Sequence, residues 1–244
     1  MTPKIETLLA WREGVLSRYE HARGSNDYSF LLAVVTDELE FILDLIGSDL
    51  EVAEHIAAES YAHANGFAKI VLGRTVGDQA SAILHVWDAA WPPINTEDNV
   101  HNHRWPLCST LISGRLEYEH YCHHSTGRPL LHYRYDRGAG HSGYAMRFVG
   151  RSTLRCVESG IREERDVYLL AEEALHRIRP VTAFAATLVV QGSPVRNETD
   201  VFSEHEGLES AHVLPPCMDI KFLQYRCMQV KEALAGSANG RIHR

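Results

Sequence analysis

The chain has 244 residues, which is enough for one sizeable domain and too few for two full-sized domains with a linker. Its 45% hydrophobic and 23% charged residues are those of an ordinary globular protein and exclude collagen-like, coiled-coil and disordered chains. With 32 acidic and 24 basic residues the net charge is -8, so we expect no nucleic-acid partner and no anionic membrane partner. The 15 histidines stand out, because histidine is the commonest metal ligand in proteins.

The first quarter of the chain is typical of helices, because its apolar residues recur three and four positions apart. A second apolar segment, 30–46, stops at Gly47, and Ser48 with Glu51 forms a capping box that predicts a third helix ending near residue 66. We therefore expect a helical region over 1–66 that packs across one face of the remaining domain. Since the second segment is strongly apolar, a homodimer that covers it is one expectation.

From residue 67 the pattern changes to short runs of branched and aromatic residues, separated by Gly, Asp, Asn and Pro. Many short strands with close turn signals favour a sandwich or barrel over a parallel sheet with crossover helices. The predicted strands are 67–73, 80–88, 100–112, 115–122, 130–136, 144–149, 152–158, 166–171 and 183–191. We expect a mainly β domain over 67–204, and a loop, a C-terminal helix and a polar tail over 205–244.

The cysteines and the start of the chain bear on location. Five cysteines, odd in number and without a Cys-x-x-Cys pair, predict reduced thiols. The first residues lack a signal-peptide pattern, and no apolar stretch reaches the roughly 18 residues that a membrane span needs. The expectation is a cytoplasmic protein without a membrane partner.

The clearest motif for chemistry is Val-His-Asn-His-Arg-Trp over 100–105. Residues two apart in a strand point to the same face, so His101 and His103 are predicted to offer two imidazoles to one ion. Gly114 is expected to turn the chain into a second strand, which makes the motif part of a hairpin. The third ligand is predicted to be His176, which stands before the apolar run 183–190. His85 is a reserve ligand, and a second site in the stretch His120-Tyr121-Cys122-His123-His124 is disfavoured.

This pattern resembles the cupin superfamily, in which a first motif supplies His-x-His and often a glutamate, a glycine follows, and a later motif supplies another histidine. The resemblance implies a double-stranded β-helix, or jelly-roll barrel, with an N-terminal helical appendage and a C-terminal helix. The motif glutamate is missing here, because its place falls at Leu107 or Cys108. A three-histidine site without a carboxylate is similar to the cysteine dioxygenase branch, which implies Fe(II) bound by His101, His103 and His176.

The same resemblance implies a cysteine and a tyrosine beside the metal. The spacing from His103 matches Cys108 to a cysteine that some of those enzymes cross-link to a tyrosine, for which Tyr144 and Tyr168 are the alternatives and Tyr168 is preferred. Arg177 follows the third ligand and is predicted to clamp a substrate carboxylate. The implied function is a non-haem Fe(II) dioxygenase-type oxidoreductase whose partners are O₂ and a small amino-acid-like or thiol substrate. The alternatives are a non-redox isomerase, epimerase or lyase, and a non-catalytic small-molecule-binding cupin.

Overall fold

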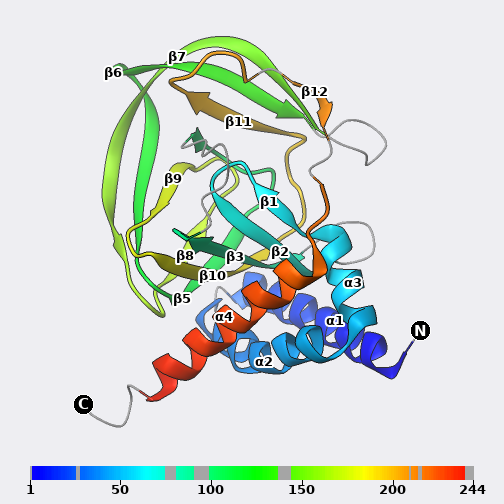
Figure 1. Ribbon diagram of the computed structural model, residues 1–244. Coiled ribbons are helices and arrows are strands. Elements are labelled where there is room, and N and C mark those ends of the chain that lie inside the picture. The colour runs from blue at the N-terminus through cyan, green and yellow to red at the C-terminus, as the bar shows by residue number, and fades with distance from the viewer. Residues whose placement is uncertain are drawn as a thin grey trace.

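A computed structural model describes residues 2–25, 28–74, 81–90, 99–136, 144–208, 210–213 and 216–239. Two six-stranded antiparallel sheets face each other, and four helices lie against the outer face of one of them (Figure 1). The prediction of a mainly β chain with N-terminal helices and a C-terminal helix is confirmed. None of the described helices is long and apolar enough to cross a membrane.

The two sheets are built from strands far apart in sequence. In order across the first sheet the strands are β1 (Tyr61–His63), β2 (Phe67–Arg74), β3 (Ser81–Asp88), β10 (Phe184–Gln191), β5 (Leu107–Ser113) and β8 (Val167–Leu170). Across the second they are β11 (Glu198–Ser203), β4 (Val100–His101), β9 (Leu175–Pro180), β6 (Leu116–Asp136), β7 (Tyr144–Arg162) and β12 (Ser210–Val213). Phe67 and Leu111 of the first sheet pack against Leu116 and Ile178 of the second, so these side chains mark the inner faces.

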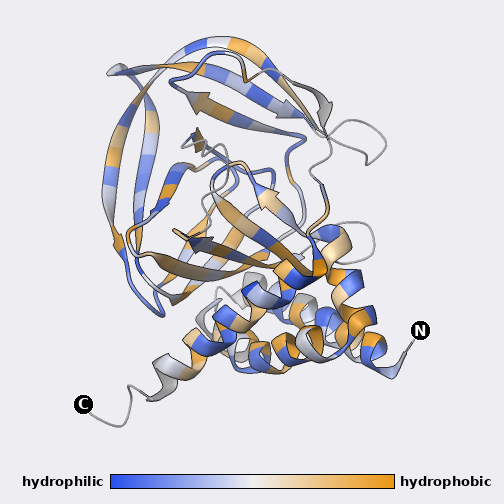
Figure 2. Ribbon diagram, in the orientation of Figure 1, coloured by the Kyte–Doolittle hydropathy of each residue, from blue (hydrophilic) through white to orange (hydrophobic). Residues whose placement is uncertain are grey.

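The second sheet closes on itself, because β11 pairs with both β4 and β6. The long strands β6 and β7 form a curved hairpin that arches away from the helices (Figure 1), and hydrophobic and hydrophilic residues alternate along it (Figure 2). Val100, Leu175 and Phe202 gather in one apolar cluster of this ring. Neighbouring residues in a strand point to opposite faces. His101 and His176, which follow Val100 and Leu175, therefore lie on the other face of the second sheet, which is the inner face toward the first sheet.

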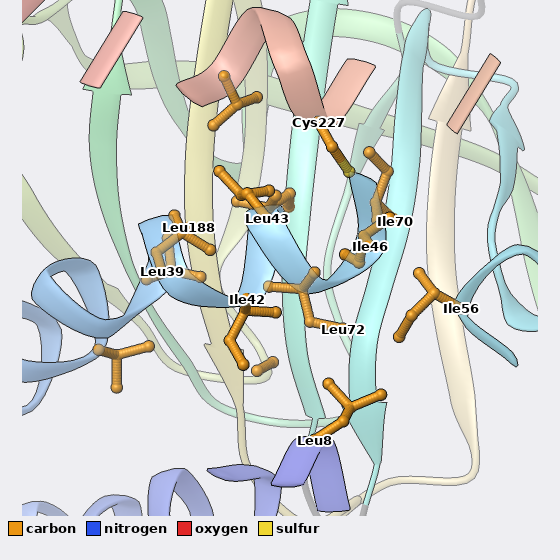
Figure 3. Packing of buried hydrophobic residues seen from close by; sticks show 14 of the residues in the cluster. Leu8, Leu39, Ile42, Leu43, Ile46, Ile56, Ile70, Leu72, Leu188 and Cys227 are labelled. Carbon is orange, nitrogen blue, oxygen red and sulfur yellow. The ribbon is translucent and has the colours of Figure 1, made fainter. Parts of the chain in front are cut away.

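The helices α1 (Pro3–Ser25), α2 (Tyr28–Ser48), α3 (Leu50–Glu59) and α4 (Ile220–Asn239) cover the outer face of the first sheet. Leu39, Ile42 and Ile46 of α2 are fully buried in one cluster with Ile70 and Leu188 of the sheet (Figure 3). The N-terminal helices therefore pack across one face of the barrel. Leu39, Ile42 and Ile46 of α2 thus face the chain's own first sheet.

The C-terminal helix is tied to the barrel by a buried ion pair. The Arg226 side chain is 1% exposed and pairs with the carboxylate of Asp88 at the end of β3. The Gln229 amide also donates to Asp88, over 3.2 Å. Burial alone raises the pKa of Asp88, but the hydrogen bonds from Arg226 and Gln229 outweigh it and leave the pKa below its ordinary value.

Several element boundaries differ from the sequence prediction. The third helix ends at Glu59, because the Ser60 hydroxyl donates to the carbonyl of Ile56 (2.7 Å) and accepts from the amide of Val71 (3.0 Å), which turns the chain into β1. The strands therefore start before the predicted boundary at residue 67, with β1, and extend beyond the predicted boundary at residue 204, with β12. The strands β9 and β11 were not predicted, since their sequences are charged and polar, and two pairs of predicted strands merge into β6 and β7.

Candidate metal centre

The three histidines predicted as ligands lie together on the inner face of the second sheet. One ligand nitrogen from each of His101, His103 and His176 lies within 4.8 Å of the other two. His101 of β4 is directly opposite His176 of β9 in the ladder, and their ring centroids are 4.6 Å apart. The ring of His103 is 4.9 Å from that of His176 and 5.1 Å from that of His101. The structure thus joins residues that are more than seventy positions apart in the chain.

Hydrogen bonds to the backbone fix the tautomers of two of these rings. The Nδ1 atom of His101 is 3.1 Å from the carbonyl oxygen of Asn99, and that of His176 is 3.2 Å from the carbonyl oxygen of Ala174. Because a carbonyl oxygen only accepts, both Nδ1 atoms carry the hydrogen, and both Nε2 atoms keep a lone pair. The Nε2 atoms of His103 and His176 approach to 3.4 Å. A metal ion can accept the lone pairs of such grouped imidazoles, and backbone acceptors behind ligand histidines are usual in metal sites.

The surroundings keep the three imidazoles neutral. Burial lowers the pKa of His101 below its ordinary value and lowers that of His176 to about 3. Burial and then the neighbouring charges of His176 and His101 hold the pKa of His103 well below its ordinary value. Neutral imidazole is the form that binds a metal. Among the described residues no carboxylate belongs to this group, so the donors are nitrogen atoms alone.

Asn102, which lies between His101 and His103 in the chain, holds the backbone of this segment in place through hydrogen bonds to Asp200. Asn102 is buried, and its amide group bonds to both the backbone and the carboxylate of Asp200. The carboxylate of Asp200 also accepts from His132 (2.9 Å), Arg134 (3.2 Å) and Arg196 (2.9 Å). Burial favours the neutral acid, but the hydrogen bonds from His132, Asn102 and the two arginines outweigh burial and lower the pKa of Asp200 to about 2.

The local backbone around the motif differs from the predicted hairpin. The strand β4 ends at His101, and the amide of His103 donates to the carbonyl oxygen of Glu172 (3.1 Å) outside the ladder. His101 and His103 therefore do not lie on one continuous strand. Gly114, with φ of 85°, carries the chain from β5 in the first sheet to β6 in the second. A Cβ there would lie 2.3 Å from the carbonyl oxygen of Phe184, so only glycine fits.

The prediction for Cys108 is wrong in its placement. Cys108 is fully buried in the apolar cluster between the first sheet and the helices, on the outer face of β5. Tyr168 of β8 is paired with Ser109 and packs in a cluster with Leu107, so it lies on the inner face. Cysteine and tyrosine therefore point to opposite sides of the same sheet and do not meet. The side chain of the alternative partner, Tyr144, lies outside the described residues.

Arg177 is also placed away from the three histidines. It follows His176 in β9, so its side chain leaves the opposite face of the sheet. There its Nε donates to the carboxylate of Glu119 (2.6 Å), and a terminal nitrogen donates to the hydroxyl of Tyr121 (2.8 Å). The predicted role as a substrate clamp is not compatible with this position. Tyr168 stays on the inner face, and burial raises the pKa of its hydroxyl.

Besides the reserve ligand His85, the inner face opposite the three histidines holds two residues that the sequence did not single out, His63 of β1 and Lys69 of β2. Burial is the main cause of the lowered pKa values of His63 and His85, and the charges of Lys69 and His101 add to it. The ring of His85 lies 4.3 Å from the ring of Phe67 at a tilt of 38°, and His85 is not among the grouped ligands. Within the described residues, the stretch His120-Tyr121-Cys122-His123-His124 forms no second group of ligands. The only sequence signal for the inner position of Lys69 was its place among apolar residues in β2.

Comparisons with known proteins add little. No protein family model and no curated protein matches the chain. Similar solved structures include a conserved protein of unknown function from Streptococcus pyogenes (11% identity, 54% of this chain, 78% of that chain, TM-score 0.31). They also include hydroxypropylphosphonic acid epoxidase from S. wedmorenis with fosfomycin (9%, 51% and 50%, TM-score 0.31). A third is hydroquinone 1,2-dioxygenase from Sphingomonas sp. TTNP3 with 4-hydroxybenzoate (11%, 52% and 66%, TM-score 0.31).

The chain spans about half the length of the epoxidase. At these identities and TM-scores the comparisons assign no activity to the chain. Support for a function therefore comes from the residues of the chain itself.

Proposed function

We propose that the chain is a metal-dependent oxidoreductase of the cupin type that binds Fe(II) through His101, His103 and His176. The observation that supports it is the convergence of three neutral imidazoles, two of them with the tautomer that leaves Nε2 free for a metal, and no carboxylate of the described residues belongs to the group. Three neutral ligands leave the full charge of a divalent ion uncompensated and leave coordination positions open. The proposed reaction is dioxygenase-type oxidation of a small amino-acid-like or thiol substrate in the cytoplasm.

An Fe(II) ion held by His101, His103 and His176 would supply Lewis acidity and one-electron chemistry. The protein's part is to hold the ligands and to limit water. The carbonyl groups of Asn99 and Ala174 orient two rings, and the Asn102–Asp200 pair fixes the backbone between His101 and His103. Trp105 lies beside His103, with nearly parallel rings whose centroids are 6.3 Å apart.

The test is metal content followed by oxygen uptake. Protein purified without a tag is loaded with Fe(II) under anaerobic conditions, and its metal is measured after desalting. We expect about one ion per chain for the wild type and for His55→Ala, a control on an exposed helical position, and loss of the ion in His101→Ala, His103→Ala and His176→Ala. Oxygen uptake is then measured across thiols and amino acids.

Each result separates the candidate functions. Oxygen uptake that depends on one of these substrates supports the proposal, and absence of bound metal in the wild type contradicts it. Turnover that proceeds at the same rate without O₂ would assign non-redox chemistry to the same centre.

A further inference from the structure

Three polar side chains form a row, or rank, across the inner face of the first sheet, which faces the three histidines. In the ladders Lys69 of β2 is paired with His85 of β3, and His85 is paired with Thr187 of β10. Directly opposed residues in an antiparallel sheet share a face. Two positions along, Phe67, Trp87 and Ala185 share that face and touch the second sheet. The rank therefore points into the space between the sheets, where the three histidines point from the other side.

Two atoms of this rank lack a hydrogen-bond partner among the described residues. Thr187 is 0% exposed, and its Oγ1 has no partner, nor does the buried Nε2 of His85. Leaving a buried polar atom unpaired costs about 1 to 3 kcal/mol, so such atoms in a native core usually serve a ligand or water. Both atoms can donate a hydrogen bond to an oxygen of a bound molecule. A hydroxyl has an O–H, and Nε2 of a neutral imidazole carries a hydrogen in one of its two tautomers.

Lys69 places a positive charge on the inner face of the first sheet, beside His85. The ammonium group of Lys69 is held over the ring of Tyr61, 5.7 Å from its centroid. Burial is the main cause of the low pKa values of His63 and His85, and the charge of Lys69 adds to it. A divalent ion on the three histidines would add two positive charges, and no carboxylate of the described residues belongs to the ligand group to balance them. An anion is the ligand that such a space favours.

We propose that Lys69, Thr187 and His85 form the carboxylate-binding end of the substrate site, so that the substrate is a small monocarboxylate whose other end reaches the three histidines. This inference rests on the proposed function and adds a substrate class to it. One ammonium group matches one carboxylate charge, and the hydroxyl of Thr187 with the Nε2 of His85 supplies two further hydrogen bonds to its oxygens. The role first predicted for Arg177 thus belongs to a lysine on the opposite sheet.

The experiment compares L-cysteine with cysteamine, which differ only by the carboxylate, as ligands of the Co(II)-loaded chain. Binding is followed by the visible absorbance of the Co(II)-thiolate. We expect the wild type to bind L-cysteine about tenfold more tightly than cysteamine, because a charge-assisted hydrogen bond is lost with the carboxylate. Lys69→Met should abolish this preference, Lys69→Arg should keep most of it, and Lys221→Met, on an exposed position, should leave it unchanged.

Thr187→Val gives an independent result, because it removes the hydroxyl at nearly constant volume. If Oγ1 serves a ligand, this variant keeps or gains stability in urea yet loses a few-fold in affinity for L-cysteine alone. Equal affinity for the two thiols in a wild type that holds Co(II), or a Thr187→Val variant with unchanged preference, overturns the carboxylate site while leaving the metal centre standing. A wild type that binds no metal overturns both proposals.

Discussion

Asn102 and Asp200 are joined by three hydrogen bonds, although 98 positions separate them in the chain. The amide of Asn102 donates to the carbonyl oxygen of Asp200 (3.2 Å), its side-chain nitrogen donates to the carboxylate (3.1 Å), and its side-chain oxygen accepts from the amide of Asp200 (2.7 Å). The pair therefore fixes both main chain and side chain of the residue between two metal-ligand candidates. We therefore expect these hydrogen bonds to contribute both to metal affinity and to the free energy of unfolding.

Asn102→Ala removes the two side-chain hydrogen bonds and leaves a buried amide hydrogen of Asp200 unpaired. We expect a loss of about 2 to 3 kcal/mol in the free energy of unfolding, measured in urea. Metal affinity should fall by roughly tenfold, because residues that orient ligands act through the ligands. The control is Asn197→Ala, on an exposed position, which should change neither quantity. Unchanged metal affinity in Asn102→Ala would remove the positioning role.

The carboxylate of Asp200 makes stability depend on acid. Its pKa in the folded chain is about 2, below the ordinary value of 3.8. A lowered folded pKa means that the unfolded chain binds the proton first, so this contribution is present above about pH 4 and is lost as the pH falls toward 2. The size is about 2 kcal/mol at neutral pH. Urea unfolding between pH 6 and pH 2.5 should show the wild type losing this amount relative to Asp200→Asn.

A control for that titration is Glu206→Gln, which changes a carboxylate that is 83% exposed and should leave the pH profile unaltered. A profile of Asp200→Asn that runs parallel to the wild type through the acid range would show that the folded chain does not stabilise the charged form of Asp200.

The ion pair between Arg226 and Asp88 should hold the C-terminal helix on the barrel. Arg226→Met leaves a carboxylate that is 10% exposed without its charged partner, and we expect a loss of about 3 to 5 kcal/mol in the free energy of unfolding. The double variant Arg226→Met, Asp88→Asn should recover much of this loss, since no charge is then left buried. Lys221→Met, on an exposed position of the same helix, is the control. Equal stability of single and double variants would argue against a coupled pair.

Cys108 should be dispensable for the metal centre. Because it packs on the outer face of the first sheet, Cys108→Ala is expected to keep its full metal content and to lose about 1 to 2 kcal/mol of stability from the smaller side chain. Burial raises the pKa of this thiol to about 12, so it stays protonated and unreactive. The intact mass of the purified wild type should equal that of the unmodified chain. A mass lower by two hydrogens, absent in Cys108→Ala, would show a cross-link after all.

The local sequence was sufficient for the fold class and for choosing the three histidines that the structure brings together. The change from helical to strand-like patterns near residue 67 depends on backbone preferences and hydrophobic periodicity, which act over a few neighbours. His101, His103 and His176 were identifiable because each is a ligand type, two of them at motif spacing and the third before an apolar strand.

Tertiary structure decided which side of a sheet each remaining candidate faces. A shift of one position reverses the face of a strand residue, and the ladders place Ser109 opposite Tyr168 and Cys108 opposite Leu169. For the same reason Arg177 turns away from the site that its neighbour His176 enters. Pairing between distant strands, which no local pattern encodes, brought Lys69, His85 and Thr187 into one rank across from the three histidines. The excess of histidine in the sequence thus pointed to a metal centre, and only the register of the sheets showed which side chains surround it.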